Sequence, residues 1–565
     1  MSTDTGSSDS TSIPSEIGNL RIRLSNFKDE IRDITDLVYG FSIYEDLFRP
    51  TCSLEMLIID AEGLIETFPI IGDEHVTITY KTRGIKNKNY KGGAALDLAS
   101  GETGELYTTR VRSFQIYKLS KKLEVEERQH AYVLFGVDDH QVMNEMIDLN
   151  QSYVGQNCIK AIQSIFTSSF IKNTDDTFRP FNIQQKLYGL GTNDPIESTN
   201  SSFYIAPGVT PFESITHLKD ESEHVDTTKF NNSDYVFYQD YEGFHITTLS
   251  ELKSQPAKHN YTVKDMASEM NNDDADKKAT EDSGDEYTAV LKFEIHKNFD
   301  TVNHLSLGTY GNRVAAIDLL TKRFDEKSFS YNSEFNNLNP MGPGRLHSRD
   351  SLYRFSGSTH TRYLPTELLS SGIPYGSSQS FQNELSSYSQ HPYFYPIAKE
   401  NADEMLDKTE GTISNEDAAK RKDSIVKNDP KIANPRRKHY LLNKRVAGKG
   451  ILDTILIDII VPGNSDIKVG DTLNFYVPQT SRDSMKYNIF FGGKDPENNK
   501  VTPKFLIVKV NQKYVSEVSS YHTIMTIAKD SYALQPEAAL ALAKEESGID
   551  DEETRWRVKH LIKNI

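Results

Sequence analysis

Very few side chains in this sequence have the types and spacing that catalysis or metal binding requires. Asp274 and Asp276 resemble the start of a calcium-binding loop, but Lys278 replaces the next acidic ligand and Ala279 stands where such a loop needs glycine. The segment fits a solvated acidic linker better than a calcium site. Cys158 lies among apolar residues with helical spacing and fits a small core residue better than a nucleophile. We expect no metal site and no cofactor.

The sequence motifs of the common enzyme classes are missing. The chain contains no phosphate loop of the form G-x-x-x-x-G-K-[ST], no H-E-x-x-H and no G-x-S-x-G, and Gly189-Leu-Gly191 lacks the third glycine of a dinucleotide-binding turn. The 15 histidines are scattered, and the 81 acidic residues form carboxylate pairs outside any recognisable glycosidase context. We therefore expect a protein that is not an enzyme. A peptidoglycan hydrolase that uses carboxylates of the 140–300 region remains the alternative.

Two local clusters favour contacts with partners rather than chemistry. The basic run comprises Pro435-Arg-Arg-Lys-His439 with Lys444, Arg445 and Lys449. It fits an arm that docks on acidic neighbours, or a plain solvated stretch, better than a nucleic-acid patch. The aromatic run His391-Pro-Tyr-Phe-Tyr-Pro396 offers Tyr393, Phe394 and Tyr395 as interface anchors, with local packing of the same segment as the alternative.

Composition narrows the class of protein further. The chain has 565 residues, with 64 Lys and Arg against 81 Asp and Glu, so its formal net charge is −17. Such a balance disfavours a general nucleic-acid binder, and two cysteines exclude a disulfide scaffold. The N-terminus lacks the pattern of a secretory signal, and acidic residues interrupt the most apolar stretch, 54–71, so we expect no membrane insertion. We expect a soluble chain that is assembled in a cytoplasm.

The elements that must position these residues are mostly strands. Alternating apolar residues predict strands between 20 and 137, and again from 451 to about 531. Helical spacing covers 139–172 and 311–324, and Thr210-Pro-Phe-Glu213 predicts the start of another helix. Asp240-Tyr-Glu-Gly243 predicts the turn of a hairpin. The sequence thus indicates a β-dominated α+β fold.

The β regions at the two ends of the chain look like copies of one unit. Phe114-Gln-Ile-Tyr-Lys-Leu119 matches Phe505-Leu-Ile-Val-Lys-Val510 at an offset of 391, and the match runs without a gap to Asp139 and Asp530. Upstream, Gly72-Asp73 matches Gly470-Asp471 at an offset of 398. We interpret this as two homologous antiparallel barrels or half-barrels. Three such chains around an axis present six nearly equivalent units.

The ordered set of segments resembles a known family. The matching segments are Phe41-Ser-Ile-Tyr-Glu-Asp-Leu-Phe48 with Pro69-Ile-Ile-Gly-Asp-Glu-His-Val76, then Ile205-Ala-Pro-Gly-Val-Thr-Pro-Phe-Glu-Ser-Ile215 with Tyr235-Val-Phe-Tyr-Gln-Asp-Tyr-Glu-Gly-Phe-His245, then Asn298-Phe-Asp300 with Gly308-Thr-Tyr310, and finally Ile459-Ile-Val-Pro-Gly463 with Ala528-Lys-Asp-Ser531. In this order they resemble the baseplate central hub protein of T-even-type, contractile-tailed bacteriophages. The segment from about 340 to 440 and the part after 535 lie outside the resemblance.

The resemblance implies a structural virion protein without catalytic residues. It implies a homotrimeric baseplate hub, located in the tail of the virion, that joins the sixfold tail tube to the threefold spike and lets genome DNA pass during ejection without binding it specifically. The implied partners are further copies of the chain, the tail spike protein and the tail tube or tube-initiator protein; tape measure and baseplate wedge proteins are additional candidates. A receptor-recognising tail component and a spike-type protein of a contractile injection system remain alternatives.

The domain organisation follows from the repeat and the resemblance together. We expect a disordered tail (1–14), a first tube-like β-barrel domain (15–137), inserted mixed α/β domains (138–290), a strand–helix connection (291–340), an extended Ser/Tyr/Pro-rich arm (341–444), a second tube-like β-barrel domain (445–533) and a helical tail (534–565). We expect Tyr44, Glu45, Asp46 and Phe48 to form a loop that contacts other subunits or the tube, with Leu47 and Phe48 as plain core residues as the alternative.

Overall fold

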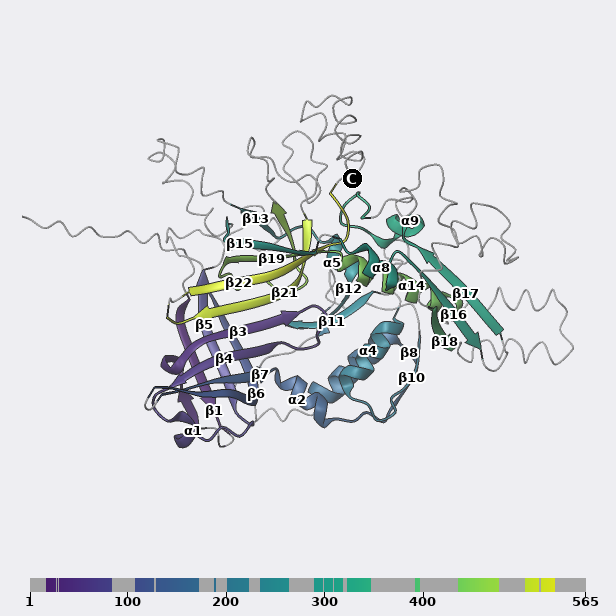
Figure 1. Cartoon of the computed structure of the whole chain (residues 1–565). Helices are drawn as coiled ribbons and strands as arrows, with labels where there is room; N and C mark the ends of the chain where they lie inside the picture. Colours follow the sequence, from purple (N-terminus) through teal and green to yellow (C-terminus); the bar gives the residue numbers. More distant parts are fainter. Residues whose placement is uncertain are drawn as a thin grey trace, which may run out of the picture.

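The structure, a computed structural model, is dominated by strands, as the sequence predicts (Figure 1). It describes residues 17–83, 107–171, 187–188, 201–222, 234–263, 289–346, 392–396, 435–476 and 504–533, with short gaps at 27, 29, 127–128, 298, 308, 319–322 and 518–519. The expected tails at 1–14 and 534–565 lie outside the described residues. None of the described helices is long and apolar enough to cross a membrane.

The first β unit is an antiparallel sheet with one core face. Its strands are β1 (Gly18–Ser25), β2 (Ile31–Asp33), β3 (Val38–Asp46), β4 (Ser53–Asp60), β5 (His75–Arg83), β6 (Tyr107–Glu126) and β7 (Gln129–Val137). They lie in the order β3-β4-β7-β6-β5-β1-β2. Burial alternates along β4, so every second side chain enters the core, because neighbouring strand residues point to opposite faces. Short helices η1 (Thr35–Leu37) and α1 (Leu64–Thr67) connect the strands.

The second β unit repeats the centre of the first. Its strands are β13 (His259–Val263), β14 (Ala289–Val290), β15 (Lys292–Lys297), β19 (Ile455–Pro462), β20 (Thr472–Tyr476), β21 (Lys504–Val515) and β22 (Ser520–Lys529). The order β19-β22-β21-β20 reproduces β4-β7-β6-β5, and all six neighbouring pairs are antiparallel. β13, β14 and β15 belong to this sheet although they precede it by more than a hundred residues.

The register of the two hairpins confirms the repeat at residue level. Gln115 pairs with Val137 in β6 and β7, and Leu506 pairs with Ala528 in β21 and β22, at the offset of 391. Both hairpins also have a bulge at the same point, after Ile116 and after Ile507, and the shared register extends to Ser120 and Asn511. Beyond Ser120, β6 has two further bulges that β21 lacks. An alternation of apolar residues alone does not impose a shared bulge, so the two units are copies of one design.

The turn before the inner strand differs between the copies. Val76 pairs with Phe114, whereas Leu473 pairs with Phe505, so this strand repeats at an offset of 397. The sequence match of Gly72-Asp73 with Gly470-Asp471 is at an offset of 398, so the copies differ by one residue between the turn and the strand. Both glycines have positive φ, 110° and 85°, which explains why glycine recurs in each turn.

The two copies share one sheet path. β21 of the second copy pairs with β3 of the first, and the described strands of both units belong to a single 14-stranded sheet. Two separate closed barrels, as expected from the sequence, are not seen among these strands. Figure 1 shows β15, β19, β22, β21, β3, β4, β7 and β6 following one another across the molecule.

A mixed α/β unit follows the first copy. It contains α2 (Asp139–Met146), β8 (Ser152–Asn157), α3 (Cys158–Phe166), the π-helix η2 (Thr167–Ile171), β9 (Leu187–Tyr188), β10 (Ser201–Ile205), α4 (Pro211–Glu221), β11 (Tyr235–Asp240), β12 (Gly243–Thr248) and α5 (Leu249–Ser254). Thr210 and Glu213 form the predicted capping box, and β11 and β12 form the predicted hairpin. Cys158 is buried in the core, as predicted.

The remaining described segments pack beside the α/β unit. They are α8 (Thr301–Ser306), β16 (Gly311–Asp318), β17 (Arg323–Ser330), α9 (Tyr331–Glu334), η5 (Phe335–Leu338), β18 (Pro392–Pro396) and α14 (Pro435–Leu452). The predicted helix at 311–324 is wrong, because this segment forms the hairpin of β16 and β17, with β18 on its other edge. The end of the expected arm is helix α14.

Gly40 tests how tightly the two copies approach each other. A Cβ at this position would lie 2.6 Å from the carbonyl oxygen of Tyr514, which is backbone and cannot rotate away. We expect Gly40→Ala to lower the free energy of unfolding by about 1–3 kcal/mol, as overpacking does, measured by urea denaturation. Gly448→Ala is the control, since nothing lies within 4 Å of its Cβ and α14 is helical there; it should be neutral or stabilising.

Candidate functional site at the junction of the two copies

The junction is a hydrogen-bonded ladder inside one chain. Its register runs from Lys509 opposite Asp46 to Val515 opposite Gly40. Two backbone hydrogen bonds extend the ladder at its ends. Leu47 N–H donates to Val508 O at 2.9 Å, and Ser516 N–H donates to Tyr39 O at 2.8 Å. The ladder therefore fixes the relative position of the two copies by backbone bonds rather than by side chains alone.

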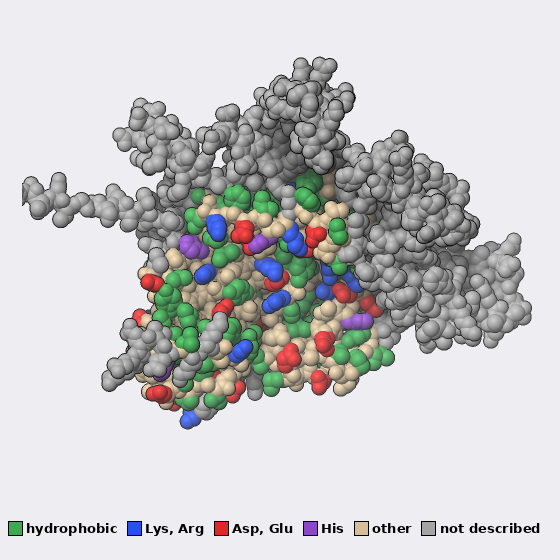
Figure 2. Space-filling model, viewed as in Figure 1, with side chains coloured by type: hydrophobic (Ala, Val, Ile, Leu, Met, Phe, Trp, Pro, Cys, Tyr) green, Lys and Arg blue, Asp and Glu red, His purple; other side chains and the backbone are tan. Residues whose placement is uncertain are grey.

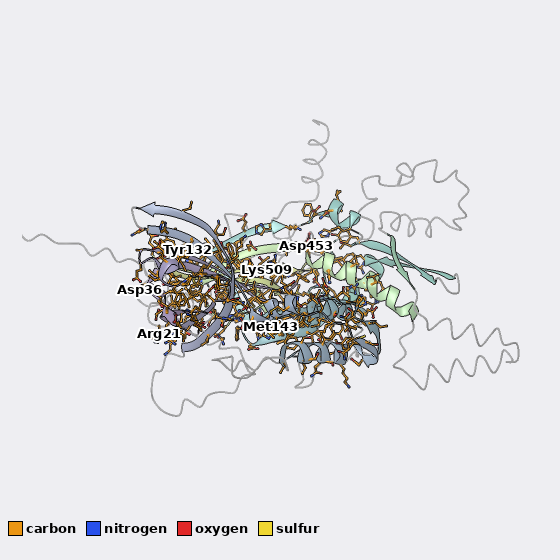
Figure 3. All side chains as sticks on the ribbon, turned by 90° about the horizontal axis from the view of Figure 1, so that it is seen from below. Arg21, Asp36, Tyr132, Met143, Asp453 and Lys509 are labelled. Atoms are coloured by element: carbon orange, nitrogen blue, oxygen red, sulfur yellow. The ribbon has the colours of Figure 1, made fainter. Side chains whose placement is uncertain are left out.

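Each copy also contributes a side chain to the core of the other. Leu47 of the first copy is fully buried in the hydrophobic cluster of the second copy. Tyr521 of the second copy is 1 % exposed and belongs to the cluster of the first. In the view of Figure 3, Lys509 appears between Tyr132 of the first copy and Asp453, which lies just before β19 of the second copy. The two cores are thus interlocked across the junction.

The residues predicted as an interface loop lie in β3 and just after it. Tyr44 is 38 % exposed and Phe48 is 47 % exposed, so both side chains reach the surface. Asp46 forms an ion pair with Lys509 at 3.3 Å across the junction. Glu45 and Leu47 are buried. The expectation of a loop is wrong because β21 pairs with this segment, and Leu47 is a core residue whereas Phe48 is not.

Tyr393, Phe394 and Tyr395 lie elsewhere in the fold. They occupy β18, where they pair in parallel with Val314, Ala315 and Ala316 of β16. Their side chains lie outside what the structure describes. β18 and β3 belong to different sheets, so the seven residues predicted as interface residues lie in two separate parts of the described fold.

A buried ion pair connects β3 to β6. Arg112 donates to Glu45 at 2.9 Å, and the two side chains are only 10 % and 4 % exposed. Burial raises the pKa of Glu45 to about 7, because the loss of water outweighs the nearby guanidinium, and Asp240 adds to the rise. Glu45 is therefore enclosed within the chain and is not available to another subunit.

The turn of the β11–β12 hairpin inserts charged groups at the same junction. Asp240 accepts backbone N–H groups of Glu242 at 2.7 Å and Gly243 at 3.2 Å, and lies 2.9 Å from His245. Lys468 of the second copy lies 2.6 Å from Glu242 and 3.7 Å from Asp240. Burial raises the pKa of Asp240, but the bond with His245 and the charge of Lys468 outweigh it and keep that pKa below its usual range.

Tyr241, at the tip of this turn, lies between cations of both copies. The Arg110 guanidinium of the first copy is 3.7 Å from the ring centroid, and the Lys468 ammonium of the second is 5.6 Å from it. Arg110 also pairs with Asp466 of the second copy at 2.8 Å. The α/β unit thus holds the two copies together through one turn. The sequence predicts the turn but gives no sign of its partners.

The same turn offers a cluster of metal-type ligands. Among the described residues, Asp240, Glu242 and His245 bring ligand atoms within 4.8 Å of one another. The ammonium group of Lys468 supplies a positive charge to both carboxylates. The donor set therefore fits an internal ion-pair network better than a metal centre. Asp274 and Asp276 lie outside the described residues.

The basic run belongs to α14 and docks on acidic neighbours. Lys444 lies 3.4 Å from Glu334, and Arg445 contacts the backbone oxygen of Asp220 and lies 3.7 Å from its carboxylate. For Lys444 and Arg445 these contacts agree with docking on acidic neighbours rather than a plain solvated stretch, whereas the side chains of 435–439 lie outside what the structure describes. Figure 2 shows acidic, basic and apolar side chains interspersed over the described part of the viewed face.

Removing the cation at the hairpin turn should destabilise the fold strongly. Lys468→Met leaves the buried Asp240 carboxylate without its ammonium partner, so we expect the free energy of unfolding to fall by about 3 kcal/mol. The control is Lys509→Met, because Lys509 is 57 % exposed and pairs with Asp46 at the surface; its cost should stay below about 1 kcal/mol. Chemical denaturation of both variants measures the difference, and equal costs would contradict the role of the turn.

Glu45 should make stability depend on pH in one window. Its pKa is higher in the folded chain, about 7, than its ordinary value of 4.5. The unfolded chain therefore releases this proton first, and the free energy of unfolding falls as pH rises from about 4.5 to about 7. Glu45→Gln keeps an acceptor for Arg112 and should remove this part of the pH slope. Urea denaturation at several pH values compares the two chains, and identical slopes would exclude the effect.

Comparisons with known proteins show similarity of structure only. No protein-family model and no curated protein matches the sequence. The structure of a tail protein from Neisseria meningitidis matches with 9 % identity and a TM-score of 0.43, over 92 % of this chain and 99 % of that chain. The 43 kDa tail protein of prophage MuSo2 from Shewanella oneidensis matches with 9 % identity and a TM-score of 0.41, over 91 % and 100 %. The E. coli c3393 protein, a component of the type VI secretion system, matches with 8 % identity and a TM-score of 0.29, over 88 % and 76 %.

Proposed function

We propose that this chain is a structural protein of a contractile phage tail: a homotrimeric baseplate hub that connects a sixfold tail tube to a threefold spike. The observation that carries the proposal is the duplicated four-strand unit, whose copies share one register and lie edge to edge through β3 and β21. Two equivalent units in each of three chains provide six similar positions around an axis. The ordered sequence segments quoted above support the same function.

The parts of the chain that occur only once among the described residues could form the threefold side of such an assembly. The α/β unit and the β16–β18 sheet have no second copy among the described residues, so a trimer presents each of them three times. A spike with threefold symmetry would meet three identical surfaces there, whereas the tube would meet six similar ones. The partners of the proposal are therefore the spike protein on one side and the tube or tube-initiator protein on the other.

A central channel for DNA requires a wall that does not hold the duplex. The net charge of −17 disfavours strong attraction to phosphates. The cations at the junction support this, because Arg110, Arg112 and Lys468 are engaged by acidic groups of the same chain. We therefore propose passage of DNA without specific binding, in a virion component that is assembled in the host cytoplasm.

We also propose that the chain is not an enzyme. The buried carboxylates at the junction, Glu45 and Asp240, are held by Arg112, His245 and Lys468 in arrangements typical of structural ion pairs. The competing function is a peptidoglycan hydrolase of the tail. A zymogram with cell-wall substrate distinguishes the two, since lysis by the purified full chain would contradict the proposal.

The assembly state tests the main proposal. Size-exclusion chromatography with light scattering of the full chain should give a particle of three times the 64.0 kDa of one chain. Electron microscopy of that particle should show six similar lobes around a central hole on one side and threefold features on the other. A chain that stays monomeric at all accessible concentrations, or a dimer with twofold symmetry, would overturn the hub.

A further inference from the structure

We propose that the sheet continues from one chain to the next, through pairing of β15 of one copy with the outer part of β6, Lys118–Glu126, of a second copy of this chain. The inference rests on the proposed trimer and names the strands that close it. The argument starts from the pairing of β3 with β21 inside one chain. β15 is the counterpart of β3, and the outer part of β6 is the counterpart of the β21 segment that pairs with β3.

β15 is the counterpart of β3. Phe41 and Ile43 of β3 pair with Met56 and Leu54 of β4. Phe293 and Ile295 of β15 pair with Ile459 and Ile457 of β19. Met56 pairs with Leu134 of β7, and Ile459 pairs with Met525 of β22. Leu134 and Met525 are equivalent positions of the repeat, so Met56 and Ile459 are equivalent as well. The two strands therefore occupy one place in the two copies, and even carry the same residue types there.

The outer edges of β3 and β15 differ in one respect. β21 covers the outer edge of β3 along its whole junction register. β15 pairs with β19 on one side, and no strand of the described residues pairs with its other side. An open strand edge presents unpaired backbone donors and acceptors, which a further strand can bind.

The outer part of β6 is the counterpart of the β21 segment that covers β3. Lys118 and Lys509 are one repeat position, and each follows the shared bulge. β5 pairs with β6 only as far as Gln115, and no other described strand pairs with that side of β6 beyond it. The first copy thus has the same docking edge that the second copy uses, and this edge is open.

Apolar side chains are exposed along both open edges. Tyr117 and Leu123 of β6 are 54 % and 64 % exposed. Ile295 of β15 is 39 % exposed, and Phe299 just after it is 68 % exposed. Apolar groups on an open strand edge favour association, because pairing removes them from water together with the backbone groups. The two edges therefore share the property that a permanent interface requires.

The internal junction also sets the register of the proposed pair. Leu123 of β6 pairs with Ala131 of β7, the repeat position of His522, and His522 pairs with Lys513 of β21. Lys513 lies opposite Ser42 of β3, whose counterpart in β15 is Glu294. We therefore expect Leu123 of one chain to lie opposite Glu294 of the next.

The pairing is head to tail, the type of contact from which rings are built. The β3 side of the first copy contacts the β21 side of the second within a chain, and the β15 side of the second copy would contact the β6 side of the next first copy. In Figure 1, β15 and β6 lie on opposite sides of the strands β19, β22, β21, β3, β4 and β7, so the two proposed contact strands face different neighbours. If the contact between chains has the same geometry as the β3–β21 junction within a chain, and six units complete the circle, the ring closes after three chains.

Charged substitutions on the open edges test the pairing. Leu123→Asp and Ile295→Asp should each shift the trimer to monomers, with the dissociation constant raised by about tenfold or more, as light scattering over a concentration series measures. The thermal midpoint of the monomer should not change, because both side chains are exposed in it. Ile31→Asp is the matched control: Ile31 is also 64 % exposed, but lies in β2, away from both edges.

Cross-linking tests the register directly. Leu123→Cys and Glu294→Cys in one chain, joined by a short bis-maleimide, should give covalent trimers on denaturing gels, whereas each single variant should give none; both native cysteines are buried. A wild-type trimer that neither dissociates with Leu123→Asp and Ile295→Asp nor cross-links overturns this pairing and leaves the hub intact. Dissociation by Ile31→Asp also overturns it. A wild-type chain that is only monomeric overturns the hub and the pairing together.

Discussion

The rest of the structure depends on the backbone ladder between β3 and β21. Without it, the two copies would be independent sheets on a long chain, and nothing would fix their spacing. The ladder sets the distance and the angle between them by the hydrogen-bond geometry of an antiparallel pair. Gly40 permits the close approach of the strands at one end, and Asp46 and Lys509 lie opposite each other at the other. A repeated unit with a fixed repeat angle is what a ring needs from each of its subunits.

The buried charged residues around this ladder determine how the two copies and the α/β unit are placed relative to one another. Glu45, Arg112, Asp240 and Lys468 come from both copies and from the α/β unit. Buried ion pairs add little stability compared with apolar packing, but an unpaired member is costly. Only the assembled arrangement pairs all of them. The cluster therefore favours one relative placement of the three parts over others that would bury similar apolar area.

Some features followed from the sequence because they are local or repeated. The ungapped match from Phe114 to Asp139 predicted the duplicated unit, and Thr210 with Glu213 predicted a helix start. The error at 311–324 has a physical cause: its apolar residues have helical spacing, but the segment pairs within the β16–β17 hairpin and with β18, which lies far along the chain. The junction was out of reach for the same reason, since the partner of β3 lies near the other end of the chain. The role of Tyr241 could not be predicted from the sequence, because the two cations that contact its ring come from other elements.

The exchange of Leu47 and Tyr521 between the cores has a consequence for biosynthesis. The first copy leaves the ribosome long before β21 and β22 exist, so it lacks Tyr521 in its core and any cover for β3 during that interval. Until translation is almost finished, the hydrophobic core of the first copy in the nascent chain is therefore incomplete, and the edge of β3 is unpaired and able to bind another strand. Neighbouring nascent chains on one messenger could exchange their C-terminal hairpins, and a holding chaperone that shields β3 would keep the correct partner within reach.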